Sequence, residues 1–104
     1  MMEYFSHNER LGIAIPNFNK DFDEYPQPTQ QLILFHWEKI RGRIPDRISE
    51  LEDMINFKQA QLNDEGNFLK SCELNSEISE LASIINDLWL WYRTHQNITE
   101  KMHL

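Results

Sequence analysis

The chain has 104 residues, with 17 acidic and 10 basic side chains and a net charge of −7. A chain of this length fits one domain, which buries about 60–65% of its unfolded surface and so holds one modest core. The acidic balance argues against nucleic-acid binding, because that binding needs Lys and Arg to neutralise phosphates. The longest unbroken apolar runs, residues 32–35 and 88–92, are too short to span a bilayer. We therefore expect neither a nucleic acid nor a membrane as partner.

The sequence offers little support for catalysis or for a bound cofactor. The four histidines lack the i, i+4 spacing of a metal site, and the single cysteine, Cys72, fits a small residue at the apolar edge of a helix. One cysteine allows no intramolecular disulfide, and the chain opens without a secretory signal pattern. We expect a cytoplasmic protein with no catalytic residue, no cofactor and no metal.

Residues 1–27 carry aromatic side chains without a helical period, and Pro26 and Pro28 bound a segment that cannot continue a helix. We expect an irregular, aromatic-rich N-terminal arm that packs on the helices. Within it, residues 11–15 either pair as a short strand or lie across the helices. A first helix is expected over 28–43, ended by Gly42 and by Pro45, which disfavours a helical conformation in the residue before it.

Basic side chains gather where this first helix meets the next one. They complement the negative carboxyl end of the first helix, or they form a patch that binds an anion or an acidic segment of a partner. The patch consists of Lys39, Arg41, Arg43 and Arg47.

A second helix is expected over 45–65, with an apolar stripe that includes Ile48, Leu51 and Ile55. Phe57 lies nearly opposite this stripe, so we expect the first helix, the arm or another molecule to cover it. Gly66 suits a left-handed conformation past the helix end, and Asn67 suits the cap of a third helix. If Gly66 is tolerated inside a helix, at a cost of about 1 kcal/mol relative to alanine, residues 45–95 form one long helix instead.

The third helix, expected over 67–95, has the strongest apolar pattern in the chain, and residues 96–104 are expected to fray. Its seam residues recur at spacings of four, three, four, three and four. Ile84 and Trp91 widen the seam on one side, and Ala82 and Trp89 widen it on the other. The apolar surface covers about half of the helix, which is more than one antiparallel neighbour can bury. The seam residues are Leu74, Ile78, Leu81, Ile85, Leu88 and Tyr92.

These elements predict an all-α fold, in which a long antiparallel helical hairpin follows a short helix and the arm. Two such hairpins would cover each other in a four-helix bundle, so we expect a homodimer. The expected function is a small protein-interaction or regulatory module without catalytic activity, which binds a protein partner. The candidate interface combines the surplus apolar residues of both long helices: Phe57, Ile84, Leu88, Trp89, Trp91 and Tyr92.

Carboxylates on the third helix give one alternative. Glu77-x-x-Glu80 resembles the magnesium motif of the all-α nucleotide pyrophosphohydrolases, and that resemblance implies an enzyme in which a Glu-x-x-Asp pair from a facing helix completes the Mg²⁺ site. The corresponding pair here, Glu50 and Asp53, precedes the first motif instead of following it. Two further acidic residues, Glu73 and Asp87, line up with the first pair beside the seam.

A second alternative comes from residues 71–78, SCELNSEI. This segment resembles the Ser-x-x-Leu-Asp-x-x-Ile motif of the small helical-hairpin phosphatases that dephosphorylate response regulators in sporulation control. The sequence has Asn75 where that family has aspartate. The resemblance implies that Asn75 faces outward beside Ser71 on an exposed patch.

Overall fold

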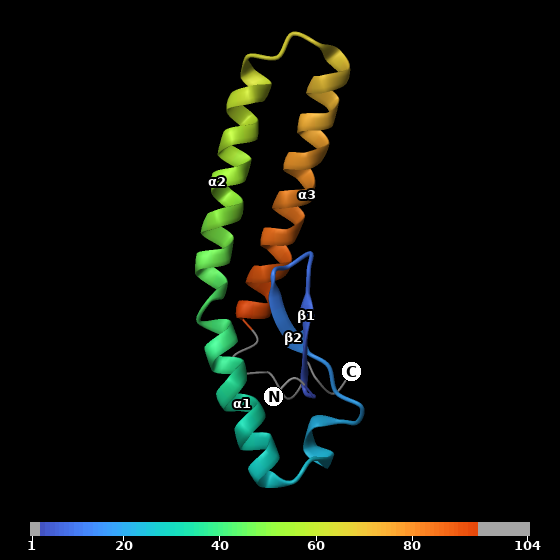
Figure 1. Cartoon of the computed structure of the whole chain (residues 1–104), viewed down its shortest axis with the longest axis vertical. Helices are drawn as coiled ribbons and strands as arrows, with labels where there is room; N and C mark the ends of the chain where they lie inside the picture. The colour runs from blue at the N-terminus through green and yellow to red at the C-terminus, as the bar shows by residue number, and fades with distance from the viewer. Residues whose placement is uncertain (1–2, 94–104) are drawn as a thin grey trace.

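The computed structural model of the chain describes residues 3–93 (Figure 1). The fold is mostly helical, and its two long helices pack against each other as an elongated hairpin, as predicted. The molecule measures 59 × 21 × 21 Å. In chain order the elements are β1 (Phe5–Asn8), β2 (Ile13–Pro16), the 3₁₀ turn η1 (Phe22–Glu24), α1 (Gln27–Arg41), α2 (Ile44–Asn63) and α3 (Phe68–Tyr92).

The α2–α3 hairpin is built on the predicted apolar seam. Leu51 of α2 and Leu74 and Leu88 of α3 are each buried to 2% exposure or less. Asn67 caps α3, because its side-chain oxygen accepts a hydrogen bond from the Lys70 backbone N–H at 3.0 Å. The alternative of one long helix over 45–95 is excluded by this turn. The expected tail, 96–104, and the end of the expected third helix lie outside the described residues.

The expectation of a left-handed Gly66 is wrong. Within residues 3–93 the only positive φ belongs to Gly12, at 77°. The end of α2 is closed by backbone bonds, from Asp64 N to Gln61 O and from Glu65 N to Leu62 O, each 3.2 Å long. These i→i+3 bonds tighten the last turn and satisfy its carbonyls, so no left-handed residue is needed.

The N-terminal arm contains a regular β-hairpin, where an irregular segment was expected. Strands β1 and β2 pair antiparallel, with Phe5 opposite Pro16 and Asn8 opposite Ile13. Asn8 organises the turn, because its side chain accepts from Leu11 N and its carbonyl accepts from Gly12 N. Of the two outcomes considered for residues 11–15, the structure shows the strand, which begins at Ile13.

The core lies where the β-hairpin, α1 and the base of the α2–α3 hairpin meet. Its largest fully buried side chains include Trp37 of α1 and Phe22 of η1. The Trp37 ring packs edge-on against Trp91 of α3, with the ring centroids 5.6 Å apart. The far half of the α2–α3 hairpin extends beyond this core as two helices alone (Figure 1).

Candidate interaction face

One side of α3 is occupied by the β-hairpin. Arg10, in the β1–β2 turn, reaches the helix through three contacts: Nε to Glu80 Oε1 at 3.0 Å, Nη1 to Asp87 Oδ2 at 2.7 Å, and Nη2 to Ser83 Oγ at 2.9 Å. The hydrogen bonds to Asp87 and Glu80 raise the pKa of the Arg10 guanidinium. Arg10 therefore anchors the turn on an acidic row of α3.

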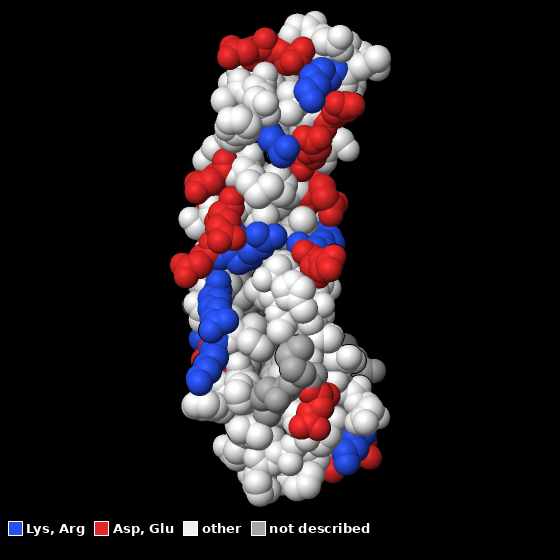
Figure 2. All heavy atoms as spheres, in the orientation of Figure 1, with Lys and Arg blue, Asp and Glu red and all other residues white. Residues whose placement is uncertain are grey.

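The other acidic residues of this row also contact lysines. Lys58 Nζ of α2 lies 2.8 Å from Glu77 Oε1, and its hydrogen bond lowers the pKa of the Glu77 carboxyl. Lys70 Nζ lies 3.6 Å from Glu73 Oε2. Figure 2 shows acidic and basic side chains interspersed along both long helices. Residues 3–93 contain no cluster of three or more His, Cys, Asp or Glu side chains that could hold a metal ion.

The predicted basic patch is divided among separate contacts. Arg41 lies over the Tyr92 ring at 4.5 Å, and its Nη1 donates to the Tyr92 carbonyl at 3.3 Å. Lys39 lies over the Phe35 ring at 4.6 Å. Arg47 Nε donates to the Leu11 carbonyl at 3.0 Å, which ties α2 to the β-hairpin. Three of the four basic side chains are therefore engaged within the fold.

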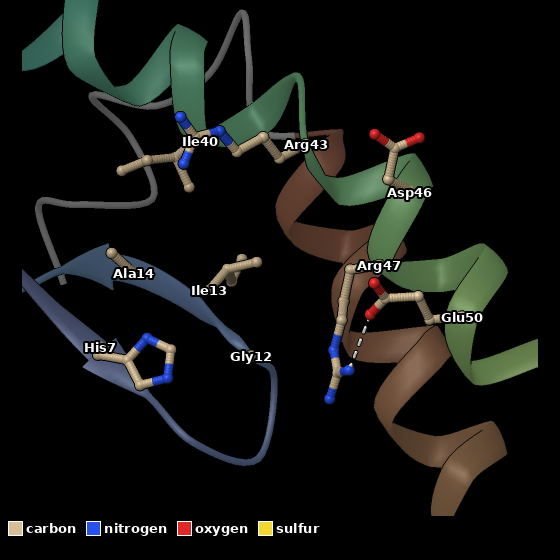
Figure 3. A pocket seen from close by; sticks show the side chains of 9 residues that line it. All are labelled: His7, Gly12, Ile13, Ala14, Ile40, Arg43, Asp46, Arg47 and Glu50. Atoms are coloured by element: carbon tan, nitrogen blue, oxygen red, sulfur yellow. Dashed lines mark hydrogen bonds and ion pairs between the residues drawn. The ribbon is translucent and has the colours of Figure 1, made fainter. Parts of the chain in front are cut away.

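The fourth basic residue, Arg43, is exposed and lines a pocket of about 470 Å³ between β2 and the α1–α2 junction (Figure 3). Arg47 and His7 line the same pocket. Two carboxylates, from Asp46 and Glu50, lie there as well, and Glu50 pairs with Arg47 at 3.1 Å. The two arginine charges are therefore balanced within the pocket itself.

A groove of about 560 Å³ lies between α2 and α3. It is on a different side of α3 from Glu80 and Asp87, which Arg10 contacts. Half of its lining residues are apolar, namely Ile55, Ala82 and Ile85, and half are polar, namely Asn56, Glu52 and Asp53. At 100° per residue, Ala82 lies about 140–180° around α3 from each residue of the acidic row. The groove and the β-hairpin therefore occupy different sides of the helical pair.

Helical spacing extends this groove along both helices. Residues three and four apart share a face, which places Ala82 and Ile85 in one row with three further residues of α3. We call these two rows the neutral face, because Glu52 is their only charged residue, although Asp53 also lines the groove between them. The neutral face consists of Ile48, Glu52, Ile55 and Gln59 of α2, and Asn75, Ile78, Ala82, Ile85 and Trp89 of α3.

The six predicted interface residues differ in how exposed they are in the structure. Ile84 is 8% exposed and Leu88 is 0% exposed, so both belong to the core of the chain. Trp91 and Tyr92 are half-buried. Trp89 remains 36% exposed. Phe57 is 66% exposed, so neither α1 nor the arm covers it.

The remaining sequence-predicted residues lie on the outside of α3. Cys72 is exposed, where a small core residue was expected, because it lies about 160° around α3 from the buried Leu74. Asn75 is exposed and Ser71 is half-buried. Sequence reasoning did not find the groove at Ala82, although the absence of charge from the row 75, 78, 82, 85 and 89 is a signal that could have found it.

Searches of protein-family models, of curated proteins and of solved structures find no match for this chain. Within residues 3–93, no helix has both the length and the hydropathy needed to cross a membrane.

Proposed function

We propose that the chain is a small cytoplasmic protein-interaction module, without catalytic activity, that forms a homodimer through the neutral face. The observation that carries the proposal is a groove between two helices that exposes the apolar side chains of Ile55, Ala82 and Ile85, with Glu52 and Asp53 as its only charged lining residues. The chain has a single cysteine, Cys72, and therefore no intramolecular disulfide, which supports a reducing, cytoplasmic compartment.

The distribution of charge indicates which face of the chain would bind a second copy. Two copies of the same acidic chain repel each other where like charges meet, and such contacts cost several kcal/mol. The side of α3 that carries Glu77, Glu80 and Asp87 is already engaged by ionic contacts with Lys58 and Arg10. The neutral face exposes apolar and amide side chains and one carboxylate, Glu52, so a second copy meets fewer charged groups there.

The neutral face is the size of a small interface. Its residues 48–59 and 75–89 extend about 17–21 Å along the helices, and the molecule is 21 Å wide. The face therefore presents about 400 Å² in projection, half of the roughly 800 Å² that each partner contributes to a standard interface. Packing two hairpins on this face gives four helices around one core, the arrangement of a four-helix bundle.

The test is the molar mass in solution by light scattering, for the native chain and two variants. We expect the native chain to have twice its 12.5 kDa mass. Ala82→Glu places a charge in the groove and should weaken the dimer at least about 100-fold, since each 1.4 kcal/mol is a factor of ten. Ser76→Glu adds the same charge at an exposed position about 120° around α3 from Ala82, and should remain dimeric.

Circular dichroism of both variants establishes that they are folded. A native chain that stays monomeric at its highest soluble concentration would overturn the proposal of self-association. A folded Ala82→Glu variant that dimerises as well as the native chain would overturn the assignment of the face.

A further inference from the structure

The neutral face carries both a hollow and a projection, at a fixed distance from each other. The hollow is the groove that Ala82, with its single methyl group, lines together with Ile55 and Ile85. The projection is Trp89, a large aromatic residue that is still 36% exposed. Seven residues separate them, or about 10 Å along α3, and this spacing of two turns puts them on the same side of the helix.

We infer that, in the dimer, Trp89 of each copy inserts into the groove beside Ala82 of the other copy, with the two α3 helices antiparallel. This inference rests on the proposed self-association and specifies its geometry. The two-fold axis passes midway between the hollow and the projection, between Ile85 and Asn86. Around that axis both insertions form together, because in a two-fold interface residue i contacts j while j contacts i.

Trp89 is held in place before it meets a partner. Its ring packs edge-on against Tyr92, with the centroids 5.5 Å apart at 88°. Tyr92 in turn lies under the Arg41 guanidinium, which also binds the Tyr92 carbonyl. A side chain that is already ordered loses less conformational entropy on binding. Trp89 is therefore a preorganised projection.

The groove suits an indole ring in both of its parts. The half-buried Ile55 and Ile85 offer apolar contact to the ring. A buried tryptophan side chain removes about 150–250 Å² of surface from water. Glu52, Asp53 and Asn56 also line the groove and carry oxygen acceptors for the indole N–H, which can only donate. A parallel arrangement would instead place Ala82 against Ala82 and leave both hollows unfilled.

Cysteine cross-linking tests the register directly, in a Cys72→Ser background. Asn86→Cys places a thiol beside the two-fold axis, near its own copy, within the Cα separation of about 4.4–6.8 Å that a disulfide needs. We expect a covalent dimer on mild oxidation. Asn75→Cys is the matched control, since Asn75 is an exposed asparagine of the same face. Its two copies would lie about 30 Å apart in the antiparallel dimer and should not cross-link.

A second measurement tests the insertion itself. Trp89→Ala should weaken the dimer by about 30-fold, as expected for a buried aromatic anchor. Phe57→Ala removes a more exposed aromatic ring that lies outside the neutral face, and should leave the dimer dissociation constant unchanged.

The outcomes separate this inference from the proposed function. A native dimer whose Asn75→Cys variant cross-links in place of Asn86→Cys overturns the antiparallel register and leaves self-association standing. A native dimer whose dissociation constant is unchanged by Trp89→Ala overturns the insertion. A native chain that is monomeric overturns both proposals.

Discussion

Gly12 joins the β-hairpin to α2 through a contact that has no room for a side chain. Its φ of 77° is left-handed, and a Cβ there would overlap the Arg47 guanidinium, which binds the Leu11 carbonyl. Gly12→Ala should therefore lower the free energy of unfolding by at least about 1–2 kcal/mol. Gly66 is the matched control: its φ is not positive, and a methyl group on its Cα would have no other atom within 4 Å.

Urea denaturation of the two glycine variants measures the difference. Gly66→Ala should be neutral or stabilising by up to about 1 kcal/mol, because alanine reduces the entropy of the unfolded chain. Equal stability of Gly12→Ala and the native chain would show that the β1–β2 turn does not depend on its contact with Arg47.

Trp37 contributes volume to the core, but one of its polar atoms has no partner within residues 3–93. It is 1% exposed, and its Nε1 has no hydrogen-bond partner among the described residues. Burying an unpaired donor costs about 1–3 kcal/mol. Trp37→Phe removes that donor along with some volume, so we expect a loss of less than about 2 kcal/mol, against about 3–5 kcal/mol for Trp37→Ala. If thermal or urea unfolding shows equal losses for both variants, the indole N–H is satisfied in solution.

At the scale of helices, Lys58 and Glu77 link α2 to α3 through a contact that depends on pH. The contact lowers the pKa of the folded Glu77 carboxyl below its ordinary value of 4.5. Folding is therefore favoured above that ordinary value, and the contribution is lost as pH falls through the lower, folded pKa. Denaturation at neutral pH and at about pH 3 should show a smaller acid loss for Glu77→Gln than for the native chain. An equal loss in both proteins would mean that this pair does not contribute to acid sensitivity.

The sequence predicted the helical hairpin because its signals are local. The spacing of Leu74, Ile78 and Leu81 defines a seam within one helix, and Asn67 caps that helix by bonding a residue three positions away. The β-hairpin was missed because its strands have four residues each, too few to show a period. Its signals were the turn residues Asn8 and Gly12.

The candidate face was predicted only in part, because coverage depends on contacts between distant segments. The sequence showed that α3 carries more apolar surface than one helix can bury, but not which side the N-terminal arm covers. Ile84 shares its row with Glu80 and Asp87, and Arg10 anchors the β-hairpin on that row. Ile84 is therefore buried, and Trp89, on the other side of the seam, remains exposed.

At the scale of the whole molecule, the described chain is more extended than a compact domain. Its radius of gyration is 17.6 Å, against about 13 Å for a compact domain of 100 residues. The difference arises because the far half of the α2–α3 hairpin has no third layer (Figure 1). Met54, Phe57, Phe68 and Leu69 are exposed there. With the two-fold axis between Ile85 and Asn86, a second hairpin on the neutral face would add a layer over residues 79–92 of α3, at the base of the hairpin.

If folding and association are coupled in this way, the melting temperature depends on protein concentration. Association stabilises the folded state by mass action, whereas a monomer unfolds at a temperature independent of concentration. For a dimer of this size, a tenfold rise in concentration should raise the melting temperature by about 3 °C. Ala82→Glu should abolish this dependence, while Ser76→Glu should retain it. Differential scanning calorimetry at several concentrations measures the slope, and a zero slope for the native chain would mean that each hairpin is stable without a partner.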